Sequence, residues 1–150
     1  ERRDEISQQL DPAQNWSHAD FEKARAFALT IKDKPKHNKI DINELRAFLI
    51  QKRQFLLRLL ENPNVLEHER LSDLLLAVFH LAEELELRTS VNDLPESDLE
   101  HLGGDMQRVY GHLAAEWLAH VEHLKSEYPY LFSLVIRTHP FKEHPSAVVT

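Results

Sequence analysis

Residues 98–141 read DLEHLGGDMQRVYGHLAAEWLAHVEHLKSEYPYLFSLVIRTHPF, and this stretch decides the predicted fold. Its large apolar residues recur at steps of three and four, which places them along one stripe of an α-helix. The stripe consists of Leu102, Met106, Val109, Leu113, Trp117, Val121, Leu124 and Tyr128. Directly after it, the segment Tyr128–Phe132 breaks this periodicity at Pro129 and concentrates large apolar side chains. We therefore predict a long amphipathic helix followed by a short terminal helix that begins at Pro129.

The rest of the chain repeats the helical pattern between short polar turns. Only three glycines occur and β-branched runs are scarce, which argues against sheet folds. Predicted helix N-caps, each with an acidic residue three positions later, are Ser17, Asp41, Asn64 and Ser97. At Gly103-Gly104 we expect an interruption of the last long helix, with Asp105 as a new cap. We predict an all-α fold, an antiparallel helical bundle of about four to six helices with a short C-terminal helix.

The length of 150 residues fits a single helical domain over residues 1–150. Within it, we expect residues 1–15 to form a juxtamembrane helix or linker and residues 142–150 to form a loose tail. The first residue is Glu rather than Met, which suggests a piece of a longer chain.

The formal net charge of −7 is unevenly distributed. Residues 1–60 carry 12 Lys/Arg against 9 Asp/Glu, and residues 61–150 carry 6 against 16. This acidic balance argues against nucleic acid as a partner, whereas the basic first part fits an anionic membrane surface near residues 1–60. The absence of cysteine excludes disulfides and thiolate chemistry. Because no serine, threonine or carboxylate pair stands in a catalytic motif, we predict no enzyme activity, no catalytic residue and no cofactor.

Ten histidines in 150 residues require an explanation. The histidines and acids of the last long helix fall at helical spacing along one stripe, namely His101, Asp105, His112, Glu116, His120 and His123. Such spacing can present metal ligands, and His80 with Glu83 or Glu84 is the obvious supply from a facing helix. The same residues equally fit the solvated flank of an amphipathic helix. We assign no metal ligand and keep a His/Glu metal-binding bundle as an alternative.

Residues 33–44 have the length and partly the acids of an EF-hand calcium loop. Asp33, Asp41 and Glu44 occupy ligand positions, but Pro35 and His37 stand where oxygen ligands are needed. Three lysines within the loop would also repel a cation. A helix-loop-helix connection explains the same residues, so we predict no calcium site.

The segment 128–141 carries the main hypothesis for a partner. Its apolar residues Tyr130, Leu131, Phe132, Leu134, Val135 and Ile136 are too many for one face of a short helix. We expect about half of them to be buried and the rest to form an exposed apolar patch, which is typical of a partner or oligomer contact. The change Phe132→Asp would test self-association through this segment.

The run WLAHVEHLKSEYPYLFSLVIRTHPF, Trp117 to Phe141, resembles the C-terminal end of prokaryotic two-transmembrane, potassium-channel-like (ion transport 2) proteins. The matching pattern is YPYLFSL followed by Arg137, Thr138, Pro140 and Phe141, with His139 where that family has Asn. The resemblance implies a cytoplasmic helical domain that follows a transmembrane pore region.

We therefore interpret the chain as a non-enzymatic assembly or regulatory domain on the cytoplasmic side of the cell membrane. It would form a homo-oligomer through helix flanks and residues 128–141, and an upstream pore region would be its covalent neighbour. Two alternatives stay open. One is a metal-binding helical bundle that uses His112, Glu116, His120 and a partner from residues 80–84, and the other is a soluble adaptor that binds a partner through the YPYLF segment.

Overall fold

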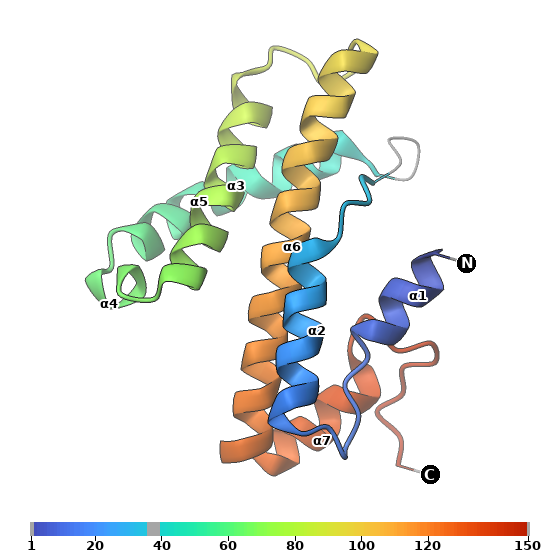
Figure 1. The fold of residues 1–150 in the computed structure, drawn as a ribbon. Helices are drawn as coiled ribbons and strands as arrows, with labels where there is room; N and C mark the ends of the chain where they lie inside the picture. The colour runs from blue at the N-terminus through green and yellow to red at the C-terminus, as the bar shows by residue number, and fades with distance from the viewer. Residues whose placement is uncertain (1, 36–39, 150) are drawn as a thin grey trace. The chain divides into compact units, whose positions relative to one another are not determined.

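The computed structural model describes residues 2–35 and 40–149, and every regular element in them is an α-helix (Figure 1). The helices are α1 (Arg2–Gln9), α2 (His18–Thr30), α3 (Ile42–Leu60), α4 (Pro63–Leu66), α5 (Glu69–Leu87), α6 (Glu96–Glu127) and α7 (Pro129–Thr138). The predicted all-α fold with a short C-terminal helix is confirmed. Seven helices occur among the described residues rather than four to six, partly because the turn after α3 is itself the single-turn helix α4.

The chain divides into two compact units, which we call unit 1 and unit 2. Unit 1 combines Glu1–Thr30 with Ala114–Thr150, and unit 2 is Ile31–Leu113. Helix α6 therefore contributes its C-terminal part to unit 1 and its N-terminal part to unit 2. The single domain over residues 1–150 stays a prediction.

In unit 1, α2 lies alongside the C-terminal part of α6 (Figure 1). Its start is a capping box, as predicted: the Ser17 N–H donates to Asp20 Oδ2 at 2.7 Å, and the Asp20 N–H donates to Ser17 Oγ at 3.3 Å. The Trp16 carbonyl accepts a hydrogen bond from Lys125 Nζ on α6. The buried apolar residues of unit 1 include Leu10, Phe21, Ala24, Ala28, Ala114, Ala115, Leu118, Val121, Leu124 and Phe132. Their burial on α2, α6 and α7 supplies the hydrophobic stabilisation of this unit.

In unit 2, α3 and α5 pack against each other and α4 joins them. Asp41 caps α3 as predicted, because its side chain accepts the Glu44 N–H at 2.9 Å. The core of the unit is formed by Ile42, Leu49, Leu81, Ala82, Leu85, Val91 and Leu102. The predicted helix start at Asn64 is wrong. Asn62 instead caps α4, with Pro63 at its first position, and α5 begins only at Glu69.

Helix α6 continues through Gly103-Gly104, so the predicted interruption is wrong. Leu102, next to the glycine pair, is buried in the hydrophobic core of unit 2, and this burial opposes the low helix propensity of glycine. Gly103 also faces Lys34, whose side chain would lie 3.6 Å from a Cβ at this position.

The apolar stripe of α6 is only partly buried. Leu102, Val121 and Leu124 are buried as expected, whereas Leu113 and Tyr128 are 52% and 45% exposed. In their place the small residues Ala114 and Ala115 and the neighbouring Leu118 are buried.

The predicted loose tail is anchored to α7 as far as residue 147. The Ser146 N–H donates to the Arg137 carbonyl at 2.9 Å, and Arg137 Nη1 donates to the Ala147 carbonyl at 2.5 Å. Lys142 also pairs with Asp11 at 3.2 Å. Within residues 2–35 and 40–149, each helix is too short or too polar to cross a bilayer.

Candidate functional site

A ring of two histidines and two carboxylates lies between α5 and the first turns of α6 in unit 2. His80 and Glu84 are one helical turn apart on α5, and His101 and Asp105 are one turn apart on α6. His80 Nε2 lies 3.8 Å from Glu84 Oε1 and 3.6 Å from Asp105 Oδ2. His101 Nε2 lies 3.6 Å from Glu84 Oε2 and 3.5 Å from Asp105 Oδ2. Each imidazole therefore faces both carboxylates.

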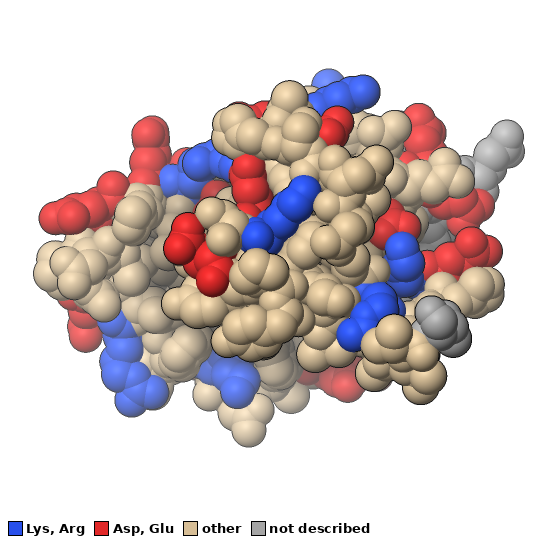
Figure 2. Space-filling model, turned by 90° about the horizontal axis from the view of Figure 1, so that it is seen from below, with Lys and Arg blue, Asp and Glu red and all other residues tan. Residues whose placement is uncertain are grey.

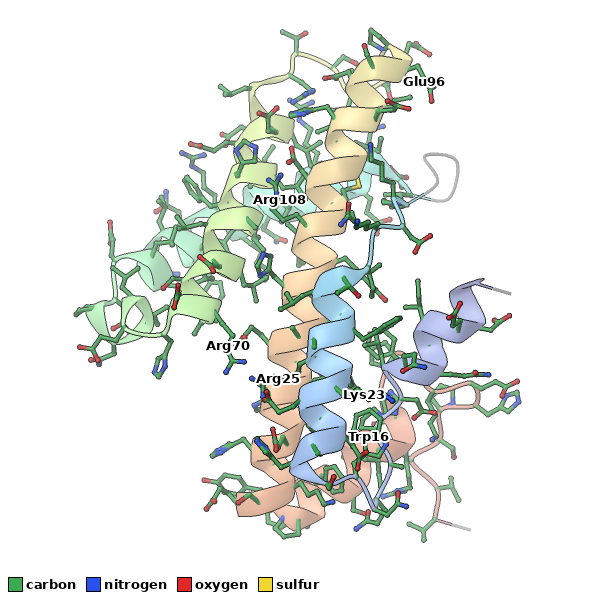
Figure 3. The ribbon with its side chains drawn as sticks, in the orientation of Figure 1. Trp16, Lys23, Arg25, Arg70, Glu96 and Arg108 are labelled. Atoms are coloured by element: carbon green, nitrogen blue, oxygen red, sulfur yellow. The ribbon has the colours of Figure 1, made fainter. Side chains whose placement is uncertain are left out.

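The two helices run in opposite directions through this ring. His80 pairs with Asp105 and Glu84 pairs with His101, so residue numbers rise on one helix as they fall on the other. Figure 3 marks this part of α6 with its labels at Glu96 and Arg108. The antiparallel packing thus brings together two His–acid pairs that are 21 residues apart in the sequence.

Asp105 is the most buried member of the ring. Its side chain is 5% exposed, compared with 47% for His80 and 51% for His101. Arg108 Nη1 donates to Asp105 Oδ1 at 3.2 Å. Among the described residues, Asp105 Oδ2 is buried and has no hydrogen-bond partner. The oxygen that faces both histidines is therefore the one left unsatisfied.

Arg88 anchors one side of the ring. Its guanidinium makes two hydrogen bonds to Asp98, at 2.9 and 2.7 Å, and a third to Glu84 Oε2 at 2.8 Å. The hydrogen bond from Arg88 holds the pKa of Glu84 below its usual value, and the same contact lowers the pKa of Asp98. Both carboxylates in turn raise the pKa of Arg88, led by Asp98. Glu84 therefore stays ionised at neutral pH.

A second His–acid group, His18, Glu22 and Glu122, lies on the surface of unit 1. Among the described residues its ligand atoms are within 4.8 Å of one another. However, Arg25 is held against both acids, 2.8 Å from Glu22 and 3.4 Å from Glu122. Because a permanent cation already neutralises these carboxylates, the group is better suited to an ion-pair network than to a metal ion.

In this group His18 acts as an ionic partner. His18 Nδ1 lies 2.6 Å from Glu122 Oε1, and this hydrogen bond raises the pKa of His18. His18 is therefore more readily protonated in the folded state than in the unfolded chain.

The histidine stripe of the sequence analysis is divided between the units. His101, Asp105 and His112 fall in unit 2, whereas Glu116, His120 and His123 fall in unit 1. The ring joins His101 and Asp105 to His80 and Glu84, not to Glu83, which lies 3.9 Å from Arg53. His123 instead contacts the ring of Tyr128 edge-on, at a centroid distance of 6.0 Å. The structure therefore places His101 and Asp105 of α6, rather than His112, Glu116 and His120, next to His80 and Glu84 of α5.

The calcium-like loop lies partly outside the described residues, because they exclude His37 and two of the three lysines. Of the acids in this loop, Asp41 is engaged as the N-cap of α3. The remaining lysine, Lys34, donates to the Glu100 carbonyl of α6 at 3.3 Å.

Comparison with known proteins assigns the family. The family model for the C-terminal helical domain of the uncharacterized protein MJ1433 matches residues 1–137. The chain belongs to this family. The protein MJ1433 of Methanocaldococcus jannaschii is 43% identical over 136 residues, which cover 91% of this chain and 55% of that protein. The chain thus spans about half the length of its relative. No solved structure matches the chain, and neither match links it to a potassium-channel-like protein.

In this member of the MJ1433 family, α7 buries one face and exposes another. Phe132 is 1% exposed, whereas Tyr130, Leu131 and Leu134 are 72%, 40% and 43% exposed. Val135 and Ile136 are half-buried. Of the six apolar residues, Phe132 is buried, two are half-buried and three are exposed, so fewer than the expected half are buried. Phe132, however, belongs to the buried side and cannot serve as a probe of the surface.

Next to α7, His139 occupies a buried position between Trp117 and Asp11. Its ring centroid is 5.5 Å from that of Trp117, and the Phe141 N–H donates to its Nδ1 at 3.3 Å. The proton of the neutral ring is therefore assigned to Nε2. That atom is 3.0 Å from Asp11 Oδ1, but among the described residues it is not aligned for a hydrogen bond. Burial outweighs the nearby carboxylate and lowers the pKa of His139.

This buried histidine predicts a loss of stability in acid. Below about pH 6.5 the unfolded chain binds a proton that folded His139 excludes, so the free energy of unfolding falls until the pH reaches the lowered pKa. We expect His139→Gln to flatten the pH dependence of stability below 6.5 in urea unfolding series. His18→Gln is the control, because the raised pKa of His18 acts above pH 6.5. An unchanged slope below 6.5 in His139→Gln would contradict the assignment.

Proposed function

We propose that this chain is a non-enzymatic assembly domain that associates with a second copy of itself through α7. The observation that carries the proposal is the exposed face of α7, where Tyr130, Leu131 and Leu134 stand within one face of the helix. Exposed aromatic and aliphatic side chains grouped in this way are typical of interface cores.

The face carries no charge. Residues 129–136, PYLFSLVI, contain no ionisable group other than the phenol of Tyr130. The next charged residue is Arg137. Its side chain folds back along α7, where its Nε donates a hydrogen bond to the Ser133 carbonyl at 3.0 Å. Figure 2, which views the molecule from below Figure 1, shows acidic and basic side chains scattered among other residues. The face therefore lacks the charged side chains that would attract an oppositely charged partner.

A second copy fits such a face better than a charged partner does. An isologous contact sets the same patch against itself, which an uncharged patch tolerates even in a chain with a net charge of −7. A stable interface buries roughly 800 Å² per partner. A ten-residue helix is only about 15 Å long, so neighbouring helix flanks would have to contribute to the interface.

We infer the place of this domain within a longer protein from the resemblance of Trp117–Phe141 to the tails of two-transmembrane, potassium-channel-like proteins. In this setting the domain stands on the cytoplasmic side of the cell membrane, after a pore region, and its association holds the pore helices in register. The relative from Methanocaldococcus jannaschii extends well beyond the matched part, which leaves room for such a region in that protein. Sequencing the gene upstream of residue 1 tests this setting. Two long apolar spans around a filter-like loop would support it, and a different upstream domain would refute it.

Self-association predicts a specific effect of Leu134→Asp. We expect light scattering with size-exclusion chromatography to show assemblies larger than the 17.5 kDa chain for the wild type, and the monomer for the variant. The cause is a pair of like charges placed in an apolar contact, which costs several kcal/mol.

The matched control is Leu76→Asp, the same change at a residue of α5 that is 56% exposed, and it should leave the assembly intact. Circular dichroism confirms that both variants keep their helices. A wild type that is monomeric at all concentrations, or an assembly that Leu134→Asp does not weaken, would refute association through α7.

A further inference from the structure

We propose that His80, Glu84, His101 and Asp105 bind one divalent first-row transition-metal ion, such as Zn²⁺, between α5 and α6. This site lies wholly in unit 2 and does not depend on the association of α7. Its ligand set of two imidazoles and two carboxylates is one that Zn²⁺ and its neighbours accept, and that Ca²⁺ and Mg²⁺ disfavour because they prefer oxygen ligands throughout.

The backbone arrangement suits a metal site. Each helix contributes a histidine and an acid four residues later, and this spacing puts both side chains on the same face of the helix. The two pairs face each other across antiparallel helices, as in metal sites that are built in the interior of helical bundles. The ligands therefore come from rigid elements on two sides of the ion.

The distances are close to those of a bound ion. Ligands about 2.0–2.2 Å from tetrahedral Zn²⁺ lie about 3.3–3.6 Å from one another. The four contacts around the ring, between 3.5 and 3.8 Å, are at or slightly above that range. No three of these four described residues have ligand atoms mutually within 4.8 Å, so the ring is more open across its diagonals.

Tetrahedral coordination requires the ring to close across its diagonals. Both diagonals exceed 4.8 Å and must shorten to about 3.3–3.6 Å, so the two atoms of each diagonal must approach by at least about 1.2 Å. The movement falls mainly on His80, Glu84 and His101, whose side chains are at least 28% exposed and have room to rotate. Asp105 is the fixed member of the site.

An independent observation points to a cation at this position. The Oδ2 atom of Asp105 is buried, is part of a side chain that is only 5% exposed, and has no hydrogen-bond partner among the described residues. A buried carboxylate oxygen without a partner costs on the order of 1–3 kcal/mol or more. A metal ion between the two histidines would satisfy this oxygen directly.

The charges around the ring also permit a divalent cation. Arg88 and Arg108 stand beside the site, and they oppose the three carboxylates of Glu84, Asp98 and Asp105. When the histidines are neutral, the net charge of these two arginines and three carboxylates is −1. Arg88 binds Glu84 through Oε2, which leaves Oε1 directed to His80, while Arg108 binds Asp105 through the oxygen opposite the ring. Each carboxylate therefore keeps one oxygen for the ion.

The competing explanation is an ion-pair ring in which protonated histidines satisfy the carboxylates. The metal site predicts that each chain binds one metal ion, whereas the ion-pair ring predicts no stoichiometric metal binding. We would strip the chain with a chelator and titrate it with Zn²⁺ by calorimetry, then repeat the titration with Co²⁺ and follow its visible absorption. We expect one ion per chain, the intense bands of four-coordinate Co²⁺, and a higher thermal midpoint with metal.

The double variant His80→Ala/His101→Ala should bind Zn²⁺ at least about a hundredfold more weakly, because half of the ligands are lost. The matched control His112→Ala/His120→Ala removes two other α6 histidines and should bind as the wild type does. Asp105→Asn keeps the shape of the side chain and should also weaken binding, while circular dichroism reports that each variant is folded. A wild type that binds no ion, or equal binding in the His80/His101 variant, would overturn the proposal.

Discussion

Phe132→Ala should lower the free energy of unfolding of unit 1 by about 3–5 kcal/mol, as expected for removal of a buried aromatic side chain. Phe132 is 1% exposed on the inner side of α7, and Lys125 Nζ lies 5.7 Å from the centre of its ring. Truncation removes the hydrophobic burial, leaves a cavity that helices of fixed backbone cannot fill, and deletes the cation–π contact. Urea unfolding followed by circular dichroism measures the loss.

Leu29→Ala is the matched control in the same unit. Leu29 of α2 is 51% exposed, so its truncation should change the free energy of unfolding by no more than about 1 kcal/mol. Hydrogen exchange should locate the effect of Phe132→Ala in the amides of α7 and its unit. If both variants lost equal stability, Phe132 would not be the buried anchor of α7.

The second large effect is expected for Arg88→Met, which keeps the aliphatic stem and removes the guanidinium. Arg88 is 17% exposed and its hydrogen bonds hold Asp98 and Glu84, which are 29% and 28% exposed. It also donates to the Glu84 carbonyl in the last turn of α5. Loss of these charge-assisted hydrogen bonds should destabilise unit 2 by about 2–3 kcal/mol, after allowance for partial solvent screening.

The pH dependence of this loss provides a second readout. Arg88 lowers the pKa of both carboxylates, so their contribution to stability is complete above the unfolded values near 4 and is lost as the pH falls through the lowered folded values. The stability difference between wild type and Arg88→Met should therefore shrink below about pH 4. The exposed Arg58 of α3 is the control, and Arg58→Met should change stability by less than about 0.5 kcal/mol. A similar loss in both variants would show that Arg88 makes no special contribution.

The α-helical class, the capping box at Ser17 and the start of α7 at Pro129 could all be predicted from the sequence, because each depends on neighbours within one helical turn. The same reasoning failed at Gly103-Gly104. Local propensity predicts a break there, but α6 continues through the pair, with Leu102 beside it buried in the core of unit 2. The start of α5 was also missed, because His68 caps it without a side-chain hydrogen bond and so leaves no recognisable signal.

The candidate site shows the same limit of prediction from local sequence patterns. Helical spacing alone placed His101 and Asp105 on one stripe of α6 and offered His80 with Glu83 or Glu84 from α5. It could not indicate which section of α6 stands opposite α5, and it therefore favoured His112, Glu116 and His120 as the opposing ligands. The signal that would have distinguished the pairs is their symmetry, a histidine followed four residues later by an acid on each helix.

Local patterns predict most of the helices and the side chains that share a face, because helix periodicity and capping are short-range properties of the chain. Long-range packing sets the burial of Phe132, the exposure of Leu134, and the position of Asp105 between two histidines with an unsatisfied oxygen. Those outcomes depend on which helix faces meet, and that choice follows from the packing of segments far apart in the chain, which no local pattern encodes.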